Sequence, residues 1–169
     1  MSAAAVEELF PLVINYDDPH KDDIVALLND HLIFCRSTSP PEFVYALDVE
    51  ALCTQDIAFY AGRVPISDQV VVIAALRILD EKHGELKSMH TVRSVRGRGY
   101  GKSMLRHVIS DARKRGLERI SLETGTMGEF SAARQLYESF GFVECDVFGY
   151  YEPSEYSVCM TLEITSEKL

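Results

Sequence analysis

A short segment rich in glycine and basic residues carries the strongest chemical signal in the chain. It reads Arg-Gly-Arg-Gly-Tyr-Gly-Lys over residues 96–102. Glycine at alternate positions lets backbone N–H groups point at an anion that approaches closely. The window 93–106 holds five basic residues and no acidic one, although the whole chain carries a net charge of −9. A local basic patch on an acidic protein indicates a specific anion, and the segment therefore predicts a phosphate site.

A glycine cluster of this kind can also arise without any anion. A tight turn is the commoner cause of clustered glycines, and the motif alone favours a turn and a phosphate site about equally. A Walker A loop would need glycine where Arg96 stands. Gly97, Gly99 and Gly101 also lack the Gly-x-Gly-x-x-Gly spacing of a dinucleotide-binding fold. Arg-Gly tracts that bind RNA are long and repeated, unlike this segment.

The elements that must position this segment follow from apolar periodicity and turn residues. In the first half, the sequence predicts a strand ending over 12–16, a helix capped by Asp18 and Pro19 that runs to about Cys35, and a short helix within 42–53. Three strands are expected at 56–64, 70–79 and 85–92, with a turn at His83-Gly84.

The second half has clearer boundaries. We expect a helix over 100–115 that ends at Gly116, a strand over 117–123 and a helix over 131–140 that ends at Gly141. Two strands, 142–148 and 156–164, complete the chain. The order strand, helix, three strands, helix, strand, helix, two strands predicts an α/β (α+β) domain, whose mostly antiparallel sheet has helices on its faces.

Two spaced motifs resemble one family. Arg96-x-x-Gly99-x-Gly101 resembles the [Gln/Arg]-x-x-Gly-x-[Gly/Ala] signature of the GNAT superfamily of N-acetyltransferases. The segment Ala-Arg-Gln-Leu-Tyr-Glu-Ser-Phe-Gly-Phe at 133–142 is similar to that family's Ala-x-x-Leu-Tyr-x-x-x-Gly-Phe. The resemblance covers about 70–164 well and the first half only by element order. The segment 122–126 is typical of the small bacterial and fungal branch.

This resemblance implies a fold, a co-substrate and a set of binding residues. The fold would be a single domain over 1–169, with a sheet of about six to seven strands splayed at the central cofactor strand. The co-substrate would be acetyl-CoA, and no metal is expected. The residues implied to bind it are Met89, His90 and Thr91 for the pantetheine arm and Arg96, Gly97, Arg98, Gly99, Tyr100, Gly101 and Lys102 for the pyrophosphate. Phe130 departs from the family, which often has asparagine there.

Attack on a thioester requires a neutral amine, which a general base can provide. Glu85 is the candidate base, because it lies eleven residues before Arg96, as does the catalytic glutamate in the family's histone acetyltransferases. An exposed strand glutamate paired with Lys87 is an equally supported interpretation, and His90 is a weaker alternative base. Strand alternation puts Glu85 on the same face as Met89 and Thr91, at least until a bulge interrupts the strand.

Tyr137 is the candidate general acid, which would protonate the departing thiolate. The competing interpretation is a core tyrosine on the apolar side of its helix. We expect the oxyanion to be stabilised mainly by backbone N–H groups on a bulged strand.

Composition excludes several other classes of function. An apolar fraction of 47% and a charged fraction of 25% are ordinary for a globular protein. The net charge of −9 argues against nucleic-acid binding by the whole surface. No apolar run is long enough for a membrane-spanning helix, and the start of the chain lacks a basic secretory region. The four cysteines suggest buried thiols in a reducing compartment. The cytoplasm is expected, and a nucleus would fit as well.

The sequence thus predicts an acetyl-CoA-dependent N-acetyltransferase that acetylates the amine of a small molecule directly, without an acyl-enzyme. A protein or peptide N-acetyltransferase, a non-catalytic acyl-CoA-binding module and an α/β interaction domain are the alternatives. Residues 34–55 and 146–157 are expected to select the acceptor, but they carry no readable code. A homodimer is common in the family and stays open here.

Overall fold

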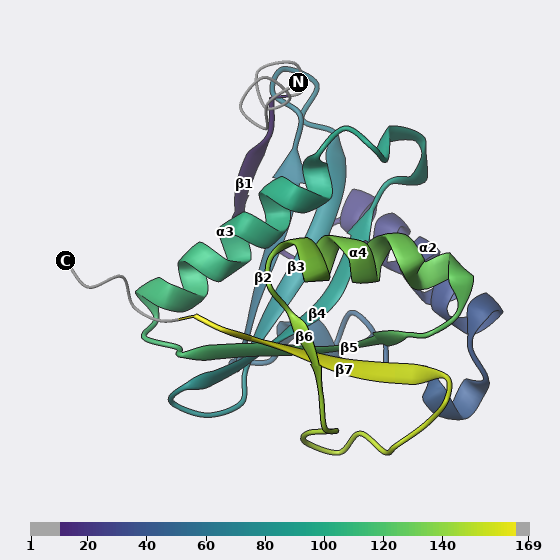
Figure 1. Ribbon diagram of the computed structural model, residues 1–169. Helices are drawn as coiled ribbons and strands as arrows, with labels where there is room; N and C mark the ends of the chain where they lie inside the picture. Colours follow the sequence, from purple (N-terminus) through teal and green to yellow (C-terminus); the bar gives the residue numbers. More distant parts are fainter. Residues whose placement is uncertain (1–10, 165–169) are drawn as a thin grey trace.

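The computed structural model describes residues 11–164. Seven strands build one sheet, and three α-helices cover it (Figure 1). The strands are β1 (Val13–Tyr16), β2 (Ile57–Arg63), β3 (Val70–Ile78), β4 (His83–Thr91), β5 (Arg119–Gly125), β6 (Val143–Cys145) and β7 (Ser157–Glu163). The α-helices are α2 (Asp22–Thr38), α3 (Tyr100–Lys114) and α4 (Ser131–Ser139).

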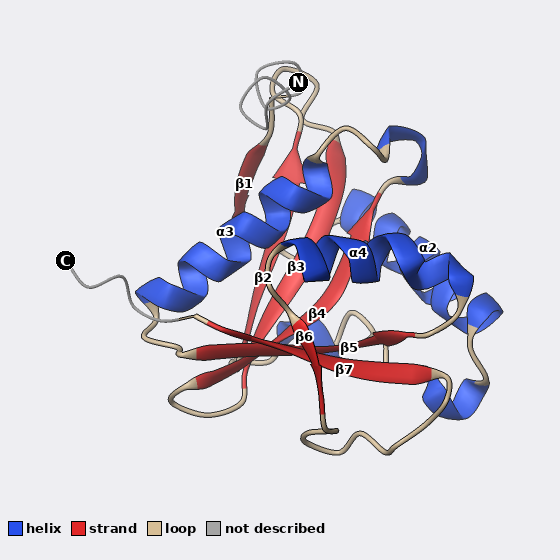
Figure 2. Cartoon of the chain, viewed as in Figure 1, coloured by secondary structure: helices blue, strands red, loops and turns tan. Residues whose placement is uncertain are grey.

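The sheet is mixed and mostly antiparallel, as the sequence predicts. Its strand order is β1-β2-β3-β4-β5-β7-β6. Among the described strands, β4 and β5 form the one parallel pair, and α3 makes the crossover between them. This arrangement confirms the expected α/β class and the expected element order (Figure 2).

The sheet splays apart at the centre. β4 and β5 pair at three positions, from His83↔Arg119 to Glu85↔Ser121. β4 then continues to Thr91, and β5 continues to Gly125, without further pairing between them. The diverging arms leave a wedge in the middle of the sheet, which confirms the splay expected at this strand.

A bulge interrupts β4 just beyond the paired part. Ile73 pairs with His90 and Ala75 pairs with Lys87, so two residues of β4, Ser88 and Met89, stand opposite Ala74. Ser88 takes a positive φ of 51°. The extra residue exchanges the faces of the strand, because side chains alternate along it.

Because of this bulge, Glu85 and Met89 lie on opposite faces of β4, and not on the same face as strict alternation predicts. Met89 packs with the residues beneath α3 and α4. Glu85 is on the same side of β4 as Lys87, two residues along, and contacts the loop that carries Tyr151.

Two apolar cores lie on the two faces of the sheet. One joins the sheet to α3 and the start of β5, and its fully buried members include Met104, Leu105, Val108 and Ile120. The other joins the sheet to α2 through Ile24, Leu27, Leu28, Phe59 and Ile73. In Figure 1, α3 and α4 accordingly lie in front of the sheet and α2 lies behind it.

Some predicted boundaries are wrong for local reasons. Helix α2 begins at Asp22 rather than at Pro19, because the Asp18 carboxylate accepts a hydrogen bond from the His20 amide and holds a turn there. The helix also runs on to Thr38, whose hydroxyl donates to the Phe34 carbonyl.

The second boundary error concerns the turn between β3 and β4. His83 and Gly84 belong to β4, and the turn lies before them, where the Asp80 carboxylate accepts hydrogen bonds from the amides of Lys82 and His83. Gly84 instead permits close packing, because an added Cβ would lie 2.8 Å from Leu117 and 2.9 Å from Leu76.

The segment 42–53 and the cysteines also differ in part from expectation. Instead of one short helix, two single 3-10 turns form, at Pro41–Phe43 and Ala51–Cys53. Cys53 is exposed rather than buried, whereas Cys159 is buried as expected.

Candidate acetyl-transfer site

A cavity of about 680 Å³ occupies the wedge between the arms of β4 and β5. Its lining includes every residue predicted to bind the cofactor: Met89, His90, Thr91, Arg96, Gly97, Arg98, Gly99, Tyr100, Gly101 and Lys102. Tyr137 also lines it, whereas Glu85 does not. The structure therefore brings together all the predicted site residues but one.

The glycine segment forms a turn that leads into α3. Gly97 and Gly99 have φ values of 80° and 88°, in the left-handed region that only glycine enters at little cost. Within residues 11–164, the backbone N–H groups of Gly97, Gly99, Gly101 and Lys102 donate no hydrogen bond. Unpaired amides at the N-terminus of a 15-residue helix are a ready anion site.

Close packing behind the turn also depends on glycine. A Cβ at Gly101 would lie 3.3 Å from Leu136 and 3.6 Å from both Met89 and Thr91. The first turn of α3 therefore lies directly against β4 and α4. Arg98, Lys102 and Arg106 line the same part of the cavity and contribute positive charge.

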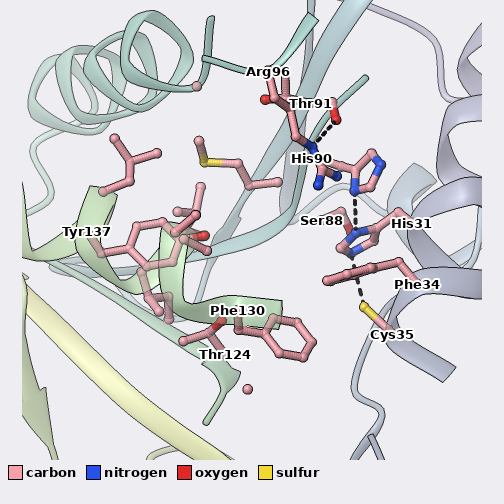
Figure 3. Close-up of a pocket in the computed structure, with 18 of the residues that line it drawn as sticks. His31, Phe34, Cys35, Ser88, His90, Thr91, Arg96, Thr124, Phe130 and Tyr137 are labelled. Carbon is pink, nitrogen blue, oxygen red and sulfur yellow. Dashed lines mark hydrogen bonds between the residues drawn. The ribbon is translucent and has the colours of Figure 1, made fainter. Parts of the chain in front are cut away.

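The Arg96 side chain takes a different direction from the amides of the glycine segment. Its Nε donates to the Thr91 carbonyl at 3.1 Å, and its guanidinium carbon lies 6.0 Å from the centre of the Phe34 ring, on helix α2. Arg96 therefore lines the cavity from the side of α2, as Figure 3 shows.

His90 forms a buried imidazole pair with His31 of α2. Their Nδ1 atoms lie 3.2 Å apart, and the rings pack edge to face. Burial lowers the pKa of His90 to about 4 and, with the His90 and Lys87 charges, lowers the pKa of His31 to about 3. Both rings are neutral at physiological pH. The role of His90 as an alternative base stays a prediction.

The bulge at Ser88 leaves one polar group unsatisfied. Among the described residues, Ser88 Oγ is the buried side-chain oxygen without a hydrogen-bond partner, and Ser88 lines the cavity. An unpaired hydroxyl of this kind is costly unless a ligand engages it. Together with the unpaired amides of the glycine segment, it fits a polar ligand that extends along β4.

Glu85 lies beneath the cavity rather than in its lining. Its side chain is buried and accepts a hydrogen bond from Tyr151, and Lys87 Nζ lies 3.6 Å from its carboxylate. The alternative of an exposed carboxylate is wrong, although the pairing with Lys87 is present. The three residues instead connect β4 to the 146–156 loop, and the role of Glu85 as a base stays a prediction.

Tyr137 lies on α4 with its ring against Phe142. It is 8% exposed, and its hydroxyl makes no hydrogen bond to any described residue. Burial, with the Glu123 charge, raises its pKa well above the ordinary range. The hydroxyl thus keeps its proton at neutral pH. The side chain serves the core, and it also lines the wall opposite Cys35 and His31 (Figure 3).

Glu123 is the functional candidate that sequence reasoning missed. It lies on the arm of β5 beyond the paired part and lines the cavity. Burial, with the nearby Glu85 charge, raises its pKa to about 7, although the Lys87 charge opposes this. The clue in the sequence is the isolated carboxylate between Leu122 and Thr124, on a strand whose apolar neighbours predict burial.

Two other kinds of chemistry, a thiol nucleophile and a metal ion, have little support in the cavity. Cys35 also lines it, but burial raises the pKa of its thiol to about 11, which disfavours a nucleophilic thiolate. Across residues 11–164, no group of three or more His, Cys, Asp or Glu side chains is placed to hold a metal ion. None of the described helices is long and apolar enough to cross a membrane.

Comparison with known proteins agrees with this geometry. The model of the Acetyltransferase (GNAT) family matches residues 22–142. The chain is 43% identical over 151 residues to YsnE of Bacillus subtilis, an uncharacterised N-acetyltransferase, and this match covers 89% of the chain and 99% of the relative.

Solved structures share the fold. A Klebsiella pneumoniae protein described as an acyl-CoA N-acyltransferase is similar, with a TM-score of 0.78 and 26% identity over 92% of this chain and 99% of that one. An Elizabethkingia anophelis acetyltransferase with acetyl-CoA bound has a TM-score of 0.64 and 17% identity over 90% and 97% of the two chains.

Proposed function

Because this chain belongs to the acetyltransferase (GNAT) family and is an acyltransferase, we propose that it transfers an acetyl group from acetyl-CoA directly to the amine of a small molecule. The observation that carries this proposal is the set of unpaired amides at Gly97, Gly99, Gly101 and Lys102, which open into the wedge between β4 and β5. A diphosphate fits these amides, and an extended arm fits the unpaired groups along β4.

Glu123 and Tyr137 divide the proton transfers in this proposal. Glu123, with a pKa raised to about 7, accepts the proton of the acceptor ammonium, directly or through water. The neutral amine then attacks the thioester carbonyl carbon. As the C–S bond breaks, Tyr137 donates its proton to the departing thiolate, and the second proton of the amine nitrogen returns to the Tyr137 oxygen through solvent. Because the thiol of Cys35 stays protonated, the amine and not the chain receives the acetyl group.

A small acceptor suits the enclosure of the cavity on the side of α2. The segment Phe43–Ala46 lines that side, and Lys87 Nζ donates to the Tyr45 carbonyl at 3.2 Å and to the Tyr151 hydroxyl at 2.7 Å. The Tyr45 and Tyr151 rings also contact each other at 4.8 Å. These contacts hold two loops against β4, where a peptide acceptor would need an open groove.

We expect acetyl-CoA to raise the thermal stability of the protein, because a ligand that binds only the folded state stabilises it. A panel of small amines, with release of free thiol as the readout, then tests transfer. Binding without turnover on any amine would support the non-catalytic acyl-CoA-binding module instead. Turnover on peptides alone would support the peptide N-acetyltransferase. Failure to bind CoA would contradict the proposal and point to an interaction domain.

Replacing the Tyr137 hydroxyl tests its role as the acid. We expect Tyr137→Phe to lower kcat about 10²-fold and to leave the affinity for acetyl-CoA nearly unchanged, since the ring still packs on Phe142. Steady-state kinetics and calorimetric titration measure the two quantities. Tyr60→Phe is the control, because it removes the hydroxyl of a buried tyrosine on β2 that does not line the cavity. Equal rates for Tyr137→Phe and the unmodified protein would reduce Tyr137 to a packing role.

A further inference from the structure

The side of the cavity next to α2 carries a cluster of polar side chains that the proposed transfer does not use. The cluster consists of Arg96, His90 and His31, with Phe34 and Cys35 beside them (Figure 3). Tyr137 lies on the opposite side of the cavity in the same view. In the proposed transfer, this side of the cavity is the one left for the acceptor.

The exposed Arg96 side chain is oriented by two contacts rather than by an ion pair. Its Nε is fixed by the Thr91 carbonyl, and its guanidinium lies over Phe34. Within residues 11–164, no carboxylate pairs with Arg96, whereas Arg63, Arg77 and Arg115 each bind an aspartate. The terminal guanidinium nitrogens remain available to a ligand, and a fixed guanidinium recognises a carboxylate through two parallel hydrogen bonds.

The imidazole pair adds a directed donor beside Arg96. Cys35 Sγ lies 3.8 Å from His31 Nε2, and His31 Nδ1 lies 3.2 Å from His90 Nδ1. One consistent arrangement has the thiol donate to His31 and His31 donate to His90, which leaves the proton of His90 on Nε2. That Nε2 makes no hydrogen bond to any described residue. Because burial, with the Arg96 charge, lowers the pKa of His90, the ring acts as a neutral donor.

Beside α2 the cavity presents one pair of opposite charges, apart from Arg98, Lys102 and Arg106 at the glycine segment. Arg96 supplies one positive charge from the segment that follows β4, and Glu123 supplies a carboxylate on the arm of β5. Lys87 adds no free donor, because Tyr45, Tyr151 and Glu85 surround its ammonium. A molecule with one carboxylate and one ammonium complements this pair of charges.

The cavity lining next to these polar side chains is aromatic. Phe34 and Phe130 meet edge to face with ring centres 5.0 Å apart, and both line the cavity. Together the two rings give this part of the lining an apolar surface. An apolar or aromatic body would bury itself against these rings.

We propose that the acceptor is an amino-acid-type amine, whose carboxylate is bound by Arg96 and His90 and whose apolar body lies on Phe34 and Phe130. This inference rests on the proposed acetyl transfer and names the second group of its acceptor. In this proposal Arg96 binds the acceptor and not the cofactor, while the amides of the glycine segment bind the diphosphate.

Matched acceptors test the proposal. L-phenylalanine and L-phenylalaninamide differ at the carboxylate, and each is assayed with the unmodified protein and with Arg96→Gln. We expect the variant to lose about 10²-fold in kcat/KM for phenylalanine and less than threefold for the amide, with unchanged affinity for acetyl-CoA. Arg96→Lys should recover part of the loss, because it keeps the charge but not the two parallel bonds.

Arg93→Gln is the matched control, since Arg93 is an exposed arginine of the same basic window and does not line the cavity. Equal losses for both acceptors, or weaker binding of acetyl-CoA by Arg96→Gln, would overturn the carboxylate assignment. If neither compound is acetylated, calorimetric titration with N-acetylphenylalanine in the presence of CoA decides. Binding that Arg96→Gln weakens supports the inference, and binding that it leaves unchanged contradicts it. Absence of CoA binding would instead defeat the proposed function itself.

Discussion

Gly99→Val should lose at least 10²-fold of the affinity for acetyl-CoA while the protein remains folded. Gly99 has a φ of 88° and a ψ of 1° directly before α3. A β-branched residue pays roughly 1–2 kcal/mol to stay there, and it relieves that strain by rotating the adjoining peptide groups. Such rotation turns the neighbouring amides of the glycine segment away from the diphosphate, and each lost charge-assisted hydrogen bond costs further affinity.

The opposite end of α3 provides the control for strain alone. Gly116 has a φ of 82°, close to that of Gly99, and an added Cβ there would meet no atom within 4 Å. We expect Gly116→Val to lower the melting temperature about as much as Gly99→Val does, but to bind acetyl-CoA normally in calorimetric titration. Similar binding losses in the two variants would show that the effect arises from a weakened helix. Normal binding by Gly99→Val would count strongly against the site.

The binding half of the site was predictable because backbone geometry dictates it. Glycines at 97, 99 and 101 are required by left-handed φ values at the first two and by close packing on Leu136 at the third. These requirements appear directly in the sequence as alternate glycines. The long periodic helices α3 and α4 were predicted to within one residue at each end for a related reason, since their apolar faces and terminal glycines mark them.

The side-chain chemistry was less predictable because a bulge decides it. One extra residue at Ser88 and Met89 reverses the faces of β4, which places Glu85 against Tyr151 instead of beside Met89. No local pattern in the sequence marks that extra residue. The environment of Glu123 depends in the same way on distant elements, since its burial arises from segments far away in the chain.

The residues that contact the acceptor could not be identified from the sequence. Of the segment 34–55, only Phe34, Cys35, Ser39 and residues 43–46 line the cavity, and its part in choosing the acceptor stays a prediction. Arg96 approaches this segment from beyond the end of β4. The 146–157 loop works indirectly, because Tyr151 supports Lys87 from behind. Such contacts join residues more than 40 positions apart and cannot be seen in a local motif.

The second large effect concerns Glu123. We expect Glu123→Gln to lower kcat/KM for an alkyl amine by about 10² to 10⁴-fold, the range for losing a general base. In the unmodified protein, the rate should rise with pH as Glu123 loses its proton near its raised pKa of about 7. The amide side chain does not titrate, so this limb should disappear, and the remaining rate should follow the pKa of the amine alone. A pH–rate profile of both proteins measures the difference.

Two further carboxylates make the test specific. Glu129 lines the same cavity but is exposed, so Glu129→Gln removes a charge from the cavity without removing a buried base. Glu85→Gln tests the base that the sequence predicts, and it also loosens the contacts with Tyr151 and Lys87. We expect Glu129→Gln to retain the limb near pH 7 and Glu85→Gln to lose stability more than rate. If the limb disappears in Glu85→Gln and persists in Glu123→Gln, the assignment of the base reverses.

Stability should change in the direction opposite to activity. The pKa of Glu123 is about 7 in the folded state and 4.5 for the free side chain, so the folded protein binds the proton more tightly. The stability that this proton provides is fully present below pH 4.5 and is lost as the pH rises through 7. At pH 8 the unmodified protein therefore holds a half-buried charge that costs about 3 kcal/mol, and Glu123→Gln removes it. We expect Glu123→Gln to melt at a higher temperature than the unmodified protein at pH 8 and at the same temperature near pH 4. If the variant also loses activity, Glu123 is a carboxylate kept for chemistry at the expense of stability.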